Sequence, residues 1–173
     1  MADDDLPGKD ALFEAMVQSR TRVQEVVDRL GEARLTGPTD AAGWTGKDHL
    51  SHLTAWERSL VSWLKGGTRA AGLGVGEDLF DSRDTQAVNE AARQATRDQS
   101  LDEVLADHDR IRAELREQVA SMSRDNLLRP YSHYPPDDPA ATVPPVYRRV
   151  LRVVGSHVDD HLGYIKAIAA QDD

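Results

Sequence analysis

Two histidines near the end of the sequence, His157 and His161, have the spacing of one helical turn. If their segment is helical, the two imidazoles point the same way and can bind one transition-metal ion together. A further pair, His49 and His52, lies in an earlier segment that also has helical periodicity. Because packed helices lie about 8–10 Å apart, histidines on facing helices can converge on one ion. The sequence therefore predicts a three-histidine metal site, with the third ligand supplied by the earlier segment.

The chemistry of such a site is that of an activated nucleophile. Three histidines with an open coordination position are a pattern of catalytic zinc, and the same donors suit nickel or iron(II). The metal ion lowers the pKa of a bound water or thiol, which yields a nucleophile at neutral pH. The competing interpretation is structural, since a single histidine on an apolar face is usually a packed core or boundary residue. The chain has no cysteine, which excludes a disulfide framework, a thiolate zinc site and a cysteine nucleophile.

The two histidine-bearing segments are predicted to be helices. The earlier helix is expected to begin after Trp44, with Thr45 as its N-cap and Asp48 close to a capping box, and to end at glycines 66 and 67. The later helix is expected to begin at prolines 144 and 145, which suit a first helical turn, and to reach about residue 170. One face of this later helix carries Val150, Val154, His157, His161, Ile165 and Ile168.

Three further helical stretches complete the predicted chain. They cover residues 9–30, with Gly31 as C-cap, about 84–97, and about 101–122, where Ser100 and Glu103 form a capping box. The glycine-rich segment between residues 66 and 84 is expected to be a crossover connection. Alternating strand patterns are absent from the sequence. We therefore predict an all-α four-helix bundle in a single domain, residues 1–173, with its core at about 9–170.

Charge and hydropathy exclude several classes of partner. The net charge of −9, from 30 acidic and 21 basic residues, repels a phosphate backbone, so a nucleic-acid partner is not expected. No stretch approaches the ~20 apolar residues that span a bilayer, so a membrane partner is not expected either. Residues 1–5 lack the basic start of a secretory signal. We expect a cytoplasmic protein that acts on a small-molecule substrate, and a homodimer formed through helix faces is left open.

Three parts of the sequence together resemble the DinB/YfiT-like superfamily. Residues 43–57, GWTGKDHLSHLTAWE, are similar to its pattern of a G-W-[ST]-x-[KR]-[DE] helix start followed by H-L-x-x-W-E. Asn89 and Glu90 resemble a short polar motif near the start of the third helix of that family. The pair His157 and His161 resembles its terminal H-x-x-x-H. The resemblance covers roughly residues 9–170, and the ordered combination is more specific than any one part.

The resemblance implies an up-down-down-up bundle with a long crossover after the second helix, and a divalent metal, most simply zinc or nickel, bound by His52, His157 and His161. The family includes metal-dependent hydrolase-like proteins and transferases that use mycothiol, bacillithiol or glutathione, and mycothiol-dependent maleylpyruvate isomerase has a related domain. We therefore predict an enzyme that activates a thiol such as mycothiol, or water, for attack on an electrophilic small molecule. The alternative is a non-catalytic binding protein that sequesters a reactive natural product for self-resistance, as in the ClbS/DfsB-like branch.

Several residues near the predicted site have two interpretations. His49 either supports a metal ligand or, as we favour, is a boundary residue. Glu57 either orients a ligand or acts as a base, although a solvated helix carboxylate is favoured. Trp56 either lines the pocket or, as favoured, packs in the core. The proline-rich segment carries three residues suited to cover the open end of the site, although an ordinary surface loop is favoured: Tyr131, His133 and Tyr134.

Overall fold

The computed structural model describes residues 8–131 and 144–172, and within these ranges the chain contains helices and no strand. The predicted all-α class is therefore confirmed. In chain order the helices are α1 (Lys9–Thr36), α2 (Gly46–Leu64), α3 (Arg69–Leu73), α4 (Glu77–Asp81), α5 (Thr85–Gln94), α6 (Leu101–Ser121), α7 (Arg124–Leu128), α8 (Val146–Val154) and α9 (Ser156–Ala169), followed by a 3₁₀ turn over Ala170–Asp172.

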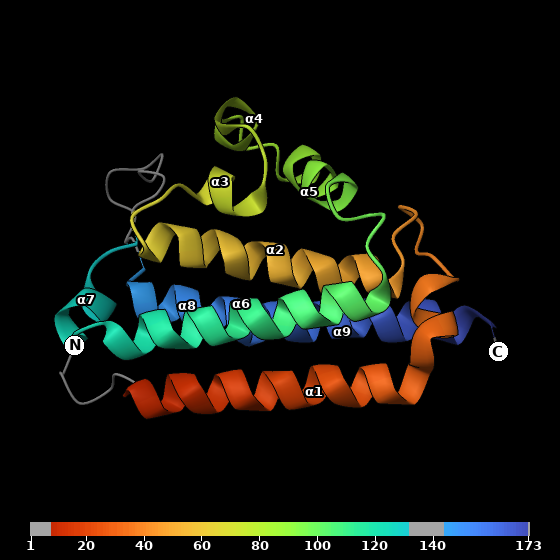
Figure 1. Cartoon of the computed structure of the whole chain (residues 1–173), viewed down its shortest axis with the longest axis horizontal. Coiled ribbons are helices and arrows are strands. Elements are labelled where there is room, and N and C mark those ends of the chain that lie inside the picture. Colours follow the sequence, from red (N-terminus) through yellow and green to blue (C-terminus); the bar gives the residue numbers. More distant parts are fainter. Residues whose placement is uncertain (1–7, 132–143, 173) are drawn as a thin grey trace.

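Four long helical segments lie side by side: α1, α2, α6 and the consecutive pair α8 and α9 (Figure 1). Helix α2 contacts α6 and α9 along its length, while α3 and α5 cover its outer side. As a result α2 is buried on nearly all faces, and Leu53 and Leu60 are among its fully buried side chains. A helix surrounded in this way can present polar side chains to an interior site rather than to water. None of the described helices is both long and apolar enough to cross a membrane.

The predicted helix starts are confirmed by the hydrogen bonds at their caps. The hydroxyl of Thr45 accepts from the backbone N–H of Asp48, and the Asp48 carboxylate accepts from the backbone N–H of Thr45 in return. Ser100 and Glu103 form the same reciprocal pair at the start of α6. Each pair satisfies backbone donors that a helix start leaves without partners, so local sequence is sufficient to fix both starts.

Other boundaries differ from the predictions. Gly31 does end the first helical run, with a left-handed φ of 71°, but the chain becomes helical again and α1 extends to Thr36. The crossover over residues 66–84 is not a plain loop, since it contains α3 and α4. The hydroxyl of Thr68 caps α3, and Gly74 ends it with φ of 74°. The last helix is interrupted at Gly155, which divides it into α8 and α9. Helix α7 was not predicted.

Close packing between α2 and α3 depends on one glycine. A Cβ atom added at Gly72 would lie 2.5 Å from the Cα of Ser59 and 2.7 Å from the carbonyl oxygen of Arg58. Both of these atoms belong to the backbone and cannot rotate away. Only glycine therefore allows α3 to lie so close to α2, and this approach sets the position of the segment that covers α2.

Candidate metal centre

The structure brings His52 of α2 together with His157 and His161 of α9. Each ring offers one nitrogen, and these three atoms lie within 4.8 Å of one another. Nε2 of His52 lies 3.1 Å from Nε2 of His157, and the ring centroids of His52 and His161 are 4.4 Å apart. Ligand nitrogens about 2.0–2.1 Å from a tetrahedral zinc ion are about 3.3 Å apart, so the His52–His157 spacing matches a shared ion. The same 3.1 Å also fits a hydrogen bond between two neutral imidazoles.

The electrostatic environment keeps these imidazoles neutral. Burial, together with the nearby rings of His161 and His157, lowers the pKa of His52 to about 2. Burial, together with the positive charges of Arg152 and Arg149, lowers the pKa of His157 to about 4. The pKa of His161 is lowered to about 3 by burial and then by His157. Because a metal binds only the neutral imidazole, this donor set fits a divalent ion at neutral pH.

His49 is buried and contacts the site, so its assignment as a boundary residue is wrong. Its Nδ1 lies 2.9 Å from Nδ1 of His161, and its Nε2 lies 3.3 Å from a carboxylate oxygen of Asp40. Burial lowers the pKa of His49, and the Asp40 carboxylate opposes that shift. The result is a chain of contacts from Asp40 through His49 to His161. Carboxylate and histidine partners of this kind orient the ligands of metal sites.

Asp40 is positioned by the turn that precedes α2. Its other carboxylate oxygen accepts from the backbone N–H groups of Ala42 and Trp44, at 2.8 and 2.9 Å. An isolated bridge between Thr39 and Thr45 closes this turn. The sequence analysis did not identify Asp40. The only local signal is an Asx-type turn just before a capped helix, and such turns are common where no site exists.

A cavity of about 350 Å³ opens beside the three histidines. Trp56 of α2 lines it and donates its indole N–H to the side-chain oxygen of Asn89 at 3.0 Å. Trp56 therefore lines the pocket, and its interpretation as a purely core residue is wrong. Asn89 belongs to the polar motif noted in the sequence, and its contact ties α5 to the edge of the cavity. The remaining described lining residues are Thr85, Arg149, Arg152 and Val153.

Glu57 follows Trp56 in the sequence but does not line the cavity. Its side chain is fully buried, and both of its oxygens accept from the guanidinium of Arg112 on α6. Arg112 also donates to the hydroxyl of Ser19 at 2.6 Å and to the carbonyl of Met16 at 3.1 Å. Both interpretations from sequence, a site residue and a solvated carboxylate, are therefore wrong. Glu57 is half of an ion pair that joins α1, α2 and α6.

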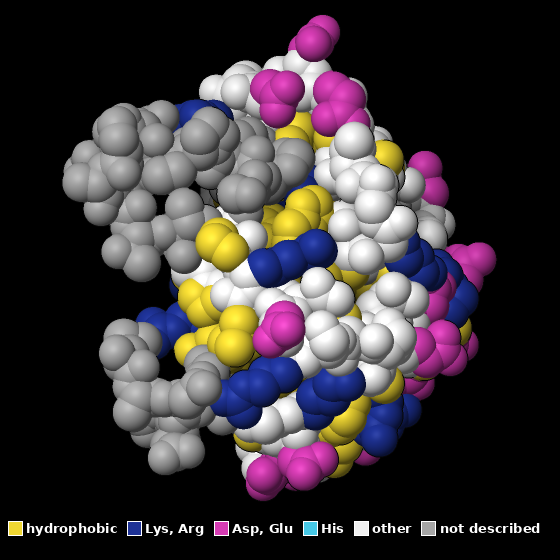
Figure 2. Space-filling model, turned by 90° about the vertical axis from the view of Figure 1, so that its left-hand side faces the viewer, with side chains coloured by type: hydrophobic (Ala, Val, Ile, Leu, Met, Phe, Trp, Pro, Cys, Tyr) yellow, Lys and Arg dark blue, Asp and Glu magenta, His cyan; other side chains and the backbone are white. Residues whose placement is uncertain are grey.

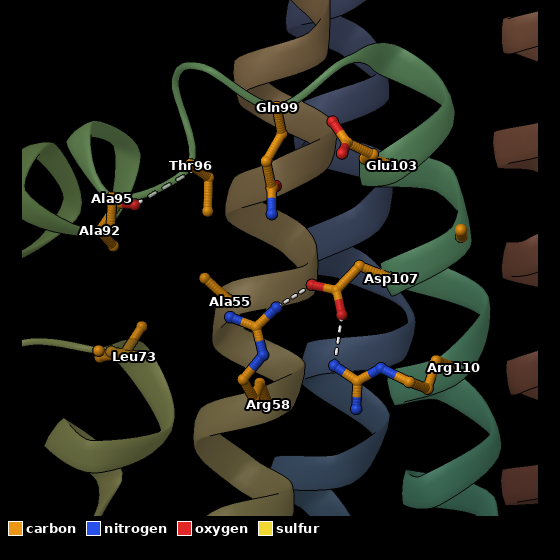
Figure 3. A pocket seen from close by; sticks show the side chains of 12 residues that line it. Ala55, Arg58, Leu73, Ala92, Ala95, Thr96, Gln99, Glu103, Asp107 and Arg110 are labelled. Atoms are coloured by element: carbon orange, nitrogen blue, oxygen red, sulfur yellow. Dashed lines mark hydrogen bonds and ion pairs between the residues drawn. The ribbon is translucent and has the colours of Figure 1, made fainter.

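A larger cavity, about 580 Å³, lies elsewhere, between α2, α3 and the start of α6 (Figure 3). Its charged groups already have partners, because Asp107 accepts from both Arg58 and Arg110, and Glu103 accepts from the backbone N–H of Ser100. Paired charges of this kind leave little for a ligand to bind. The histidine cavity is smaller, but it contains the group of ligands that can hold a metal.

Two predicted residues of the proline-rich segment, His133 and Tyr134, lie outside the described residues. Tyr131 is described, and its backbone N–H donates to the carbonyl of Pro144 at 2.8 Å. This bond holds Tyr131 beside the start of α8. Arg149 of α8 was not predicted as a site residue, but it contacts the Tyr131 ring and lines the histidine cavity.

The fold and the site define a class: a helical protein in which three histidines from two helices can hold a metal. A sequence profile of the DinB superfamily matches residues 15–165, so the chain belongs to the DinB superfamily. A crystal structure of a protein from Streptococcus pneumoniae has a similar fold, with a TM-score of 0.72 and 15% sequence identity over 94% of this chain and 90% of that chain. No curated protein matches the chain in sequence.

Proposed function

We propose that this protein is a metal-dependent enzyme in which His52, His157 and His161 hold a zinc or nickel ion. The observation that carries the proposal is the convergence of three neutral imidazoles, within 4.8 Å of one another, at the edge of a cavity of about 350 Å³. When bound, the metal supplies an activated thiol, with mycothiol as the candidate, or an activated water. The cavity beside the histidines would hold the electrophilic small molecule that reacts with this nucleophile.

The protein's own part is to hold its ligands in the correct tautomer. With Nδ1 of His161 directed at His49, the Nε2 atom of His161 is the nitrogen left for the metal. Nδ1 then carries the proton and donates to Nδ1 of His49, whose Nε2–H in turn faces the carboxylate of Asp40. This arrangement fixes the ring of His161 and increases its basicity as a ligand.

A second candidate function is sequestration without turnover, in which the protein binds a reactive small molecule. It is favoured by the lining of the cavity, where the described residues include no Asp or Glu that would serve as a general base. An enzyme built on this site must therefore rely on the metal to generate the nucleophile. A binding protein needs no such group.

Metal content and turnover separate the two candidates. Protein purified without a histidine tag is expected to contain about one zinc or nickel per chain by mass spectrometry, and His157→Ala is expected to lose it. The loaded protein is then mixed with a thiol and a fluorogenic haloalkyl electrophile. Repeated turnover of the electrophile supports the enzyme. Removal of the electrophile from solution that stops at one molecule per chain, and that persists in His157→Ala, supports sequestration. A protein that is metal-free and also refuses added Zn²⁺ and Ni²⁺ would overturn the metal site itself.

We also propose that the four long segments form the up-down-down-up bundle. This is supported by their directions in Figure 1, where α1 and the pair α8 and α9 run one way while α2 and α6 run the other. The connection between α2 and α6, which contains α3, α4 and α5, then serves as the long crossover. Its position over α2 places Asn89 at the cavity.

A further inference from the structure

A second cavity adjoins the one beside the histidines. It measures about 300 Å³ and shares Trp56, Thr85 and Arg149 with the first. Aromatic and apolar side chains line much of it, including Phe80 and Tyr131. The two cavities therefore lie side by side, with histidines beside one and an apolar wall in the other, and we call them together the two-lobed space. Volumes of this size are typical of small-molecule sites.

The charge of the two-lobed space is opposite to that of the chain. Its described lining includes no Asp or Glu, although the chain carries a net charge of −9. The end of the molecule at which α8 begins shows Lys and Arg side chains among hydrophobic ones near its middle, with most acidic side chains toward the edges (Figure 2). The described lining contains four arginines: Arg69, Arg83, Arg149 and Arg152.

Arg149 occupies the junction of the two lobes. Its guanidinium carbon lies 5.3 Å from the centre of the Tyr131 ring, and its Nε is buried without a hydrogen-bond partner in the described part of the chain. The hydroxyl of Tyr131 is buried and lacks a partner in the same way. One donor at the junction and one on the wall of the second cavity are thus left without partners, which indicates a place for an acceptor, because buried polar groups normally have partners.

Two other arginines with buried or half-buried side chains have acidic partners. Arg112 pairs with Glu57, and Arg93 lies 3.3 Å from a carboxylate oxygen of Asp48. Within residues 8–131 and 144–172, Arg149 has no acidic partner at ion-pair distance. Burial lowers the pKa of Arg149, with Arg152 adding to the effect, which reflects the cost of holding these cations together. An anionic ligand would offset that cost.

We infer that this two-lobed space binds a small organic anion, with its carboxylate or phosphate at Arg149 and its apolar body against Trp56 and Phe80. An arginine fork matches either anion with two parallel hydrogen bonds. Any part of the ligand that extends past Arg149 then reaches the histidine lobe. The inference names the substrate class for the proposed function and depends on that function only for the chemistry at this end, because the anion contact involves none of the three histidines.

Binding of matched probes tests the inference. Benzoate and phenyl phosphate are compared with their neutral counterparts benzamide and benzyl alcohol, by calorimetry and by NMR. The anions are expected to bind at least about tenfold more tightly than the neutral probes, since a hydrogen bond between charged groups contributes that much. Arg149→Met is expected to abolish the preference. Arg148→Met is the matched control, because Arg148 is exposed on the same helix and lines neither cavity, and it is expected to keep the preference.

Further arms keep the test independent of folding and of the metal. Circular dichroism reports whether Arg149→Met folds. Arg152→Met, at an exposed position of the lining, is expected to reduce the preference for anions by less than Arg149→Met does. All titrations are repeated in His157→Ala, in which the proposed metal site is disabled. Anion preference that persists there supports the inference even if the metal proposal fails. Equal binding of anions and neutral probes, or a preference that survives Arg149→Met, would overturn it. Anion binding seen only with metal present would place the anion on the ion and also overturn it.

Discussion

Replacing Glu57 by Gln should destabilise the protein severely while leaving its metal site intact. Glu57 is 0% exposed and Arg112 is 5% exposed, so neither charge is reached by water. Removing one partner of such a pair leaves the other charge buried and uncompensated, which costs about 3–5 kcal/mol. Arg112 would keep its bonds to Ser19 and Met16, which are neutral acceptors and cannot balance the charge. We therefore expect a loss in the free energy of unfolding near the lower end, about 3 kcal/mol.

Urea unfolding followed by circular dichroism measures this loss. The matched control is Asp109→Asn, which breaks the ion pair of Asp109 with Arg20, whose side chains are 53% and 51% exposed. Because exposed pairs contribute about 0–1 kcal/mol, the control should be nearly neutral. The double variant Glu57→Leu with Arg112→Leu should recover most of the stability, because it leaves no unpaired charge. If Glu57→Gln costs no more than Asp109→Asn, the reasoning is refuted.

Three further predictions concern the site and its packing. His49→Ala should lower metal affinity by about 10–100-fold, because it removes the partner that orients His161. Competition with a coloured chelator measures the affinity, and an unchanged value would contradict the proposed role of His49. The metal-free protein should lose stability as the pH falls below about 6.5, because the unfolded chain then binds protons that His52, His157 and His161, with pKa values of about 2, 4 and 3, do not bind when folded. Urea midpoints from pH 8 to pH 5 test this, and a flat or rising trend toward acid would refute it. Gly72→Ala should lower the melting temperature, because the added Cβ would lie 2.5 Å from the backbone of Ser59. Gly163→Ala is the control and should not lower it, because nothing lies within 4 Å of its Cβ. Equal melting temperatures for the two variants would refute the packing argument.

The parts of the structure that could be predicted from sequence are those fixed by local contacts. Thr45 with Asp48 and Ser100 with Glu103 are separated by three residues, and each pair satisfies backbone donors of its own helix. The spacing of His157 and His161 is equally local. These two histidines meet His52 because their helix and the helix of His52 face each other through apolar stripes. The periodicity of the sequence indicated both stripes.

The parts that could not be predicted depend on residues far apart in the chain. Glu57 pairs with Arg112, 55 positions away, and His49 contacts His161 across 112 positions. A signal for the first pair existed, since Glu57 lies on the same stripe as Leu53 and Leu60. A charged residue on an apolar stripe is expected to find a buried partner, whereas we assigned it to solvent. Arg149 carried no such signal, because its place at the cavity depends on its contact with Tyr131, which is held beside the start of α8.

The central claim is that three imidazoles share one ion between α2 and α9. Diffraction from crystals grown with zinc, recorded on both sides of the zinc absorption edge, tests it most directly. The claim predicts an anomalous peak about 2.0–2.1 Å from one nitrogen of each of His52, His157 and His161. A map with no peak there, in which Nε2 of His52 and Nε2 of His157 remain hydrogen-bonded at 3.1 Å, would contradict the shared metal site.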